Sequence, residues 1–136
     1  MTTVAETVRD ALSHLQVVDA VQPVKPQDMS DGIRALNQMM ARWEADGVSL
    51  GWVPVSNPSD TLPVPPEAEE TIAYNLALRM SARYGGEVDP VVAGFAGEGL
   101  LRLLADIASR DGARIEYDLP AGENQRWWNF YGDGGY

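Results

Sequence analysis

Apolar residues recur at helical spacing in several separate stretches of this 136-residue chain. In residues 3–17 an apolar side chain follows every three or four positions, with polar side chains between, which predicts an amphipathic helix. A second stripe starts after Pro26, where the missing N–H of proline costs nothing, and stops before Gly47, a residue typical of helix ends. The first half of the chain is therefore expected to form two helices. Their stripes are Val4, Val8, Leu12 and Leu15, and then Met29, Ile33, Leu36, Met40 and Trp43.

Two further helices are expected in the second half of the chain. The first runs from the proline pair at 65–66 to Tyr84, with three glutamates in its first turns, where the helix dipole favours negative charge. Asp89 followed by Pro90 is typical of a helix start and predicts a last helix that reaches about Ser109. Its second half is apolar on most sides, which predicts a buried helix. Three glycines weaken this helix, namely Gly94, Gly97 and Gly99. They either permit close approach of a neighbouring helix or make the first turns irregular.

Two stretches lack helical periodicity. Residues 48–65 contain four prolines and are expected to be irregular, with short extended pieces at 50–55 and 61–64. Loops of this length are uncommon inside a compact domain and are often functional. After residue 112, the segment Ala113 to Leu119 could form one strand, and residues 120–136 show no regular period.

The expected fold class is mainly α. It is a small bundle of about four helices with a long proline-rich loop and an extended, aromatic-rich C-terminal tail. We divide the chain into a helical domain, 1–112, which includes the irregular loop 48–65, and a tail, 113–136. Asn37, beside the apolar stripe, is expected to bond a backbone group of the loop that follows. The predicted structural core consists of Leu36, Asn37, Met40, Trp43, Leu76 and Met80.

The charge balance narrows the possible partners. The chain has 20 acidic and 10 basic residues, a net charge of −10, and Lys25 is its only lysine. A surface this negative repels phosphate backbones and anionic membranes, which disfavours non-specific binding to either. The sequence contains no cysteine, no apolar run of the ~20 residues needed to span a bilayer, and no secretory signal at its start. We therefore expect it to fold in the cytoplasm.

No pattern in the sequence indicates an enzyme. The single histidine, His14, lacks the neighbours that a metal site or a nucleophilic triad needs, so we expect no metal and no cofactor. Paired carboxylates could support glycoside hydrolysis, but at helix ends such pairs are far more often surface charge. The candidate pairs are Glu44 with Asp46, and Glu67 with Glu69 or Glu70.

Aromatic residues gather near the end of the chain. They either fold back over the helices or dock into another subunit, since tryptophan and tyrosine dominate interface hot spots. Stacking on nucleic-acid bases is a third possibility, which Asp133 and the scarcity of lysine disfavour. We favour partner docking. The expected anchors are Trp127, Trp128, Phe130, Tyr131 and Tyr136.

Residues 32–47 read Gly-Ile-Arg-Ala-Leu-Asn-Gln-Met-Met-Ala-Arg-Trp-Glu-Ala-Asp-Gly. This segment resembles the Leu-Asn-x-Met…Trp…Gly signature of phage head-to-tail adaptors, the tail accessory, packaged-DNA stabilisation or head completion proteins of short-tailed phages. Residues 70–85 resemble the next helix of that family, and the resemblance covers about residues 3–110. Apolar periodicity alone does not demand Asn37 or Trp43, so the first motif is fairly specific.

The resemblance implies a structural protein of the virion, located at the head–tail junction and assembled in the host cytoplasm. Its partners would be the portal protein, copies of itself in a ring, expected to be a dodecamer, and a downstream tail protein. The ring would close the DNA-filled head, and DNA would pass its acidic channel without specific binding. Two alternatives stay open: an acidic helical interaction module unrelated to phage, and a cell-wall hydrolase that uses a carboxylate pair.

Overall fold

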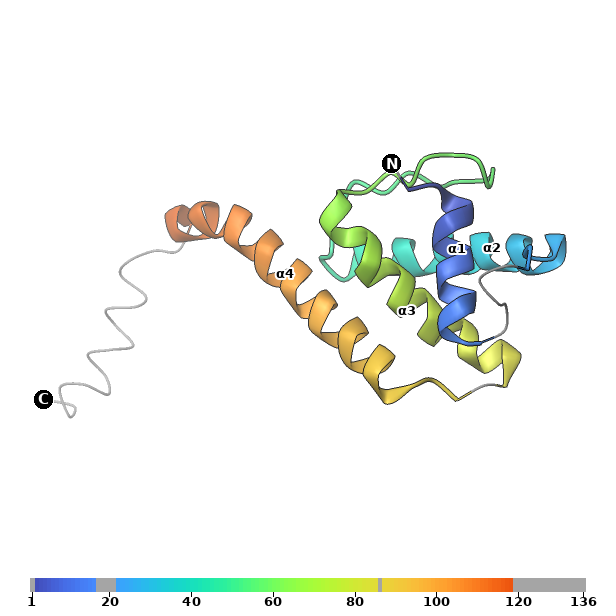
Figure 1. The fold of residues 1–136 in the computed structure, drawn as a ribbon. Coiled ribbons are helices and arrows are strands. Elements are labelled where there is room, and N and C mark those ends of the chain that lie inside the picture. Colours follow the sequence, from blue (N-terminus) through green and yellow to red (C-terminus); the bar gives the residue numbers. More distant parts are fainter. Residues whose placement is uncertain (1, 17–21, 86, 119–136) are drawn as a thin grey trace, which may run out of the picture. The chain divides into compact units, whose positions relative to one another are not determined.

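The computed structural model describes residues 2–16, 22–85 and 87–118, with side chains up to residue 110. These residues form four helices: α1 (Val4–His14), α2 (Pro26–Ala45), α3 (Pro66–Tyr84) and α4 (Pro90–Asp118) (Figure 1). The described ranges contain no strand beyond an isolated bridge between Thr3 and Thr61. The fold is therefore a mainly α small bundle, as the sequence predicts. None of the described helices is long and apolar enough to cross a membrane.

Local sequence sets the helix boundaries. Thr3 begins α1 with a capping box, in which its Oγ1 accepts from Glu6 N at 3.2 Å and its own N donates to Glu6 Oε2 at 2.9 Å. Prolines occupy the first positions of α2 and α3, as expected. Gly85 ends α3 with a φ of 64°, a left-handed conformation that costs glycine little.

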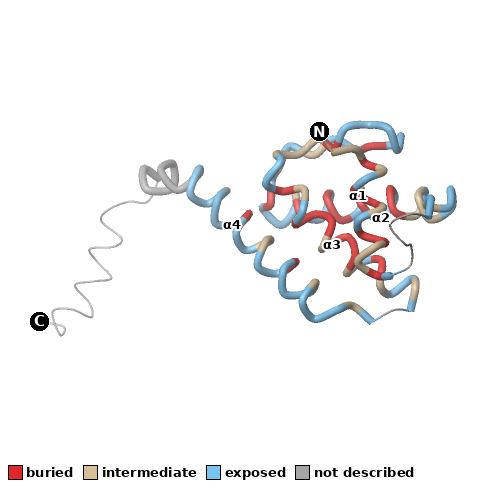
Figure 2. The backbone as a smooth tube through the Cα atoms, in the orientation of Figure 1, coloured by how far each residue is buried: buried red, intermediate tan, exposed pale blue. Residues whose placement is uncertain are grey.

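The core lies where α1, α2 and α3 pack together, and Figure 2 shows its buried residues on these three helices. A fully buried aliphatic side chain contributes about 1.5–3 kcal/mol relative to an exposed one. Gly32 permits the crossing of α1 and α2, because a Cβ there would overlap Val8. The largest fully buried apolar side chains are Val4, Val8, Leu12, Leu36, Met39, Met40, Ile72 and Leu76.

The residues that we expect to form the core occupy two different environments. The five apolar or aromatic members are buried, and Asn37 is half-buried. Asn37 Nδ2 donates to Val55 O at 2.7 Å, and Asn37 Oδ1 accepts from Val55 N at 3.0 Å. The expected bond to the backbone of the following loop is therefore present. The five buried members are Leu36, Met40, Trp43, Leu76 and Met80.

The first half of α4 packs on α3 along one side. Asn75 Nδ2 donates to Ala96 O at 3.1 Å, and a Cβ on Gly99 would overlap the side chain of Thr71. Of the three glycines expected to weaken α4, only Gly99 meets such a close neighbour; the other two face open space.

The expectation that α4 is a buried helix is wrong for the described part of the single chain. Between Pro90 and Leu104 only Ala96 and Leu103 are buried, and Leu101 is 69% exposed. Most of this stretch is pale blue in Figure 2. A helix that is apolar on most sides is normally covered by other elements, but among the described residues α3 covers only one side of α4.

The last helix also extends beyond its predicted end. Because α4 continues to Asp118, the strand expected from Ala113 to Leu119 is wrong for the residues described. A single glycine, Gly112, costs about 1 kcal/mol relative to alanine, and the residues around it are good helix formers. Residues 119–136, most of the expected tail, lie outside the described residues. The chain divides into two compact units, Met1–Leu104 and Ala105–Tyr136.

Candidate functional site

The first half of the loop 48–65 is held against α2 by a carboxylate. Glu44 Oε1 accepts from the backbone N–H of Leu50 at 3.0 Å and of Trp52 at 3.1 Å, and Oε2 accepts from Ser49 Oγ at 2.9 Å. These hydrogen bonds hold the pKa of Glu44 below its usual value, and the bond from the Trp52 backbone has the largest effect. A carboxylate stabilised as the anion is a poor general acid. Asp46, its proposed partner in hydrolysis, instead pairs with Arg42 at 3.2 Å.

Asn37 provides the second anchor of the loop. The side-chain amide of Asn37 forms hydrogen bonds with both the backbone N–H and the backbone C=O of Val55, as a neighbouring strand would. The Val55 side chain is buried. Between the two anchors, Val53 is 62% exposed. The loop is thus a fixed surface feature that presents an apolar side chain to solvent.

The second half of the loop is bonded to the beginning of the chain. Val4 N donates to Asp60 O, Ala5 N to Pro58 O, and Leu62 N to Thr2 O, each at 2.9 Å. The extended pieces expected at 50–55 and 61–64 do not form strands, because side chains and the N-terminal residues supply their hydrogen-bond partners.

The glutamates at the start of α3 also make structural contacts. Glu69 Oε2 accepts from Thr2 Oγ1 at 2.6 Å, and Glu70 Oε1 accepts from Tyr74 Oη at 3.0 Å. The Tyr74 bond to Glu70 raises the pKa of Tyr74. Glu67 likewise has an interaction partner. We therefore find no support for a hydrolytic pair in this turn.

His14 packs in an aromatic cluster. Its ring lies 4.7 Å from that of Tyr74, which lies 5.5 Å from that of Phe95. Within the ranges that the structure describes, no group of three or more histidine or acidic side chains is placed to hold a metal ion. The contacts of His14 are those of a packing residue.

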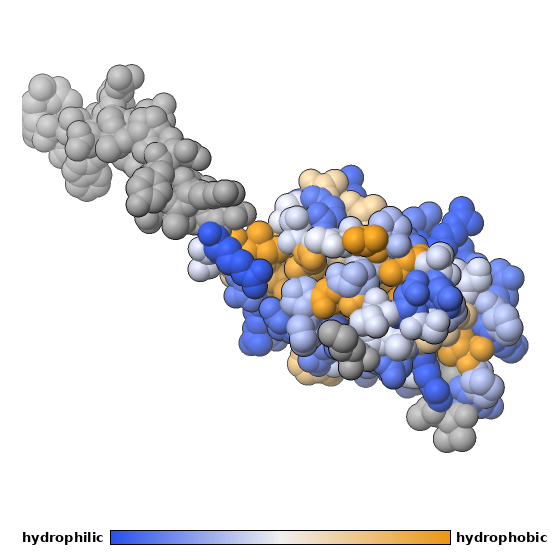
Figure 3. All heavy atoms as spheres, turned by 90° about the horizontal axis from the view of Figure 1, so that it is seen from above, coloured by the Kyte–Doolittle hydropathy of each residue, from blue (hydrophilic) through white to orange (hydrophobic). Residues whose placement is uncertain are grey.

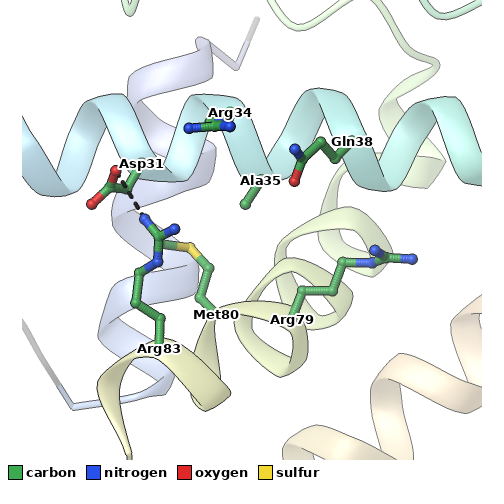
Figure 4. A pocket seen from close by; sticks show the side chains of 7 residues that line it. All are labelled: Asp31, Arg34, Ala35, Gln38, Arg79, Met80 and Arg83. Atoms are coloured by element: carbon green, nitrogen blue, oxygen red, sulfur yellow. Dashed lines mark ion pairs between the residues drawn. The ribbon is translucent and has the colours of Figure 1, made fainter.

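A hollow of about 340 Å³ between α2 and α3 is lined by arginine. We call it the arginine groove (Figure 4). Arg83 Nη1 pairs with Asp31 Oδ1 at 2.8 Å across it. The groove is not evident from the sequence, although the spacing of Arg34 to Gln38 and of Arg79 to Arg83 places each pair on one helix face. The groove is lined by Asp31, Arg34, Ala35, Gln38, Arg79, Met80 and Arg83.

Exposed apolar side chains form a second kind of surface. Three large ones lie on α4, with Val91 59%, Phe95 49% and Leu101 69% exposed. Figure 3 shows hydrophobic residues gathered in patches among hydrophilic ones on one face of the molecule. Leu100 and Leu104 line a neighbouring hollow of about 430 Å³ with residues of α2 and α3. Apolar surface of this kind is typical of sites that bind proteins. The tail anchors Trp127, Trp128, Phe130, Tyr131 and Tyr136 lie outside the described residues.

These features define the class of the protein: a small helical protein with open grooves and exposed apolar side chains on its surface. The chain matches the model of the P22 tail accessory factor family over residues 1–136 and belongs to that family. It is accordingly a structural phage protein and a component of the virion. No curated protein matches the chain.

Proposed function

We propose that the protein is a subunit of the head-to-tail connector. In this role copies form a closed ring, expected to be a dodecamer, beneath the portal protein at the head–tail junction. The ring closes the head after DNA packaging and provides the seat for the next tail component. Assembly takes place in the host cytoplasm.

The observation that carries the proposal is the exposure of large apolar side chains on α4 in a chain of the tail accessory factor family. Leu101 and Val91 are each more than half exposed in the single copy. Leaving such side chains in water forgoes about 25 cal/mol for each Å² that a partner could cover. A subunit that functions inside a larger assembly accounts for them.

The charge of the chain supports the passage of DNA. Because every copy has a net charge of −10, we expect the channel of the ring to be negative. Such a channel repels the phosphate backbone, so that DNA passes without adhering. The tail is proposed to contact the portal or a neighbouring copy through its aromatic anchors.

Co-sedimentation with the portal protein encoded by the same phage tests the proposal. We expect the free protein to sediment as a monomer or weak oligomer, and to join the portal as a complete ring at micromolar concentration. Absence of a complex at that concentration would overturn the proposal.

Removal of the tail tests the role of its anchors. A chain without residues 119–136 should keep its helical circular dichroism and melting temperature but fail to form the ring. The full-length double variant Trp127→Ser with Trp128→Ser is the matched test, since it keeps the chain length. If the shortened chain unfolds, the aromatic side chains belong to the core and the docking role is wrong.

A further inference from the structure

The arginine groove contains two cations that lack an ionic partner. Among the described residues, Arg34 and Arg79 have no carboxylate in salt-bridge range and no side-chain hydrogen bond. The other arginines up to residue 110 are engaged: Arg42 with Asp46, Arg83 with Asp31, Arg102 with Glu98, and Arg9 and Arg110 with partners of their own.

This lack of partners is informative because acids outnumber bases two to one in the chain, 20 to 10. Both side chains are exposed and line the same groove, which Arg83 also lines. Figure 4 shows them projecting from facing helices, Arg34 from α2 and Arg79 from α3. The groove is therefore a positive spot on a strongly negative molecule.

The chemistry of the groove favours protein carboxylates over nucleic acid. Guanidinium groups pair with carboxylates through two parallel hydrogen bonds. Met80 and Ala35 add apolar lining, which suits the methylene groups of a glutamate side chain. Duplex DNA would bring a continuous line of phosphates against a protein of net charge −10, which is unfavourable.

Suitable carboxylates lie at the opposite end of the same helix. Glu67, Glu69 and Glu70 occupy the first turns of α3, whereas Arg79 and Arg83 occupy its last turns. Glu67 and Glu70 are exposed. Glu70 accepts a hydrogen bond from Tyr74, and a carboxylate can accept about four.

The two ends cannot pair within one copy. Glu67 and Arg83 are 16 positions apart on α3, which is about 24 Å at the helical rise of 1.5 Å per residue. That separation exceeds the Debye length of roughly 8 Å at physiological ionic strength. Pairing of the opposite charges therefore requires a second molecule.

We propose that the arginine groove of one copy binds the acidic start of α3 of the next copy. Donor and acceptor are different surfaces, so the contact is head-to-tail, and repetition produces a closed ring when the rotation between copies fits. The inference rests on the proposed connector ring and names the surfaces by which its copies meet.

Charge-reversed variants test the contact by complementation. Arg34→Glu with Arg79→Glu makes the groove acidic, and Glu67→Arg with Glu70→Arg makes the start of α3 basic. Each double variant alone should lose copy-to-copy association at least tenfold in sedimentation velocity, both free at high concentration and on the portal. An equal mixture should regain it, because each variant then supplies the complementary surface for the other. A change that merely damages the fold would not be rescued by mixing.

The matched control is Arg42→Glu with Arg102→Glu, which alters the net charge equally at arginines outside the groove. It should associate like the unchanged protein. Normal ring assembly by the groove variant overturns this inference and leaves the connector function standing. If the unchanged protein fails to bind the portal, the connector function falls, and complementation between free variants still supports the contact. The inference is also overturned if copies of the unchanged protein do not associate either free or on the portal. It is overturned as well if the groove variants lose binding to duplex DNA but still associate normally.

Discussion

The hydroxyl of Tyr84 donates a 2.8 Å hydrogen bond to Asp28 Oδ1, which joins the last residue of α3 to the first turn of α2. The Arg83–Asp31 pair lies one turn further along α2. Burial, followed by the bond to Asp28, raises the pKa of Tyr84 to about 12. These two contacts join the end of α3 to the start of α2.

Tyr84→Phe removes this hydrogen bond while keeping the ring. We expect it to lower the free energy of unfolding by about 1.5 kcal/mol, the lower end for bonds to charged acceptors, because the pair is only partly buried. Because folding raises the pKa of Tyr84, its neutral hydroxyl stabilises the fold fully at pH values below the unfolded pKa of about 10. This contribution is lost as the pH rises through the folded pKa. The difference between the two proteins in urea melts should therefore shrink between pH 9 and pH 12. A difference that persists unchanged above pH 12 would contradict this assignment.

Glu44→Ala leaves the backbone N–H groups of Leu50 and Trp52 without their acceptor. The expected cost is about 1–3 kcal/mol, with increased hydrogen exchange in the loop 48–55. Because folding lowers the pKa of Glu44, its contribution is present above the unfolded pKa and is lost as pH falls through the folded pKa. Glu44→Gln is the control, since it keeps an acceptor oxygen but removes the dependence on acid. Equal acid sensitivity in the Gln variant would show that another group is responsible.

Leu36→Ala and Trp43→Ala truncate side chains in the core between α1, α2 and α3. Each should destabilise the protein by roughly 2–5 kcal/mol in denaturant melts. Leu36 is fully buried and Trp43 is 5% exposed, so truncation of either side chain leaves a cavity in the core. Arg42→Ala, beside Trp43 in sequence but exposed, should change stability by less than about 0.5 kcal/mol. Losses below about 1 kcal/mol for both core variants would show that this face is not core.

Two nearby glycines of α4 should respond oppositely to the same substitution. Gly97→Ala adds a methyl group in open space and should be neutral or stabilise by up to about 1 kcal/mol through helix propensity. Gly99→Ala places the methyl group on Thr71 and should destabilise the contact between α3 and α4. Thermal melts of the monomer measure both. Equal effects would mean that α4 does not pack on α3 through Gly99.

Prolines, glycines and apolar periodicity predict the four helices because these signals act within one turn of each boundary. The contact between Asn37 and the loop was predictable because a polar residue beside an apolar stripe needs a nearby partner. The role of Glu44 was not, since its bonds to Leu50 and Trp52 depend on how the loop returns to α2. The arginine groove depends on the register between α2 and α3, which no local pattern encodes. The exposure of α4 was missed because apolar composition does not say whether the covering surface belongs to the same chain.

The pairing of residues 2–5 with residues 58–62, together with the packing of α1 on α3, has a consequence for synthesis on the ribosome. The first helix emerges first but finds its principal neighbour only after about residue 80 has left the exit tunnel. Until then its apolar stripe has no lasting cover, and nascent chains expose such surfaces to chaperones and to one another. Messages that stop before α3 should therefore yield products that are aggregated or degraded, and virion assembly can draw only on chains translated past that point.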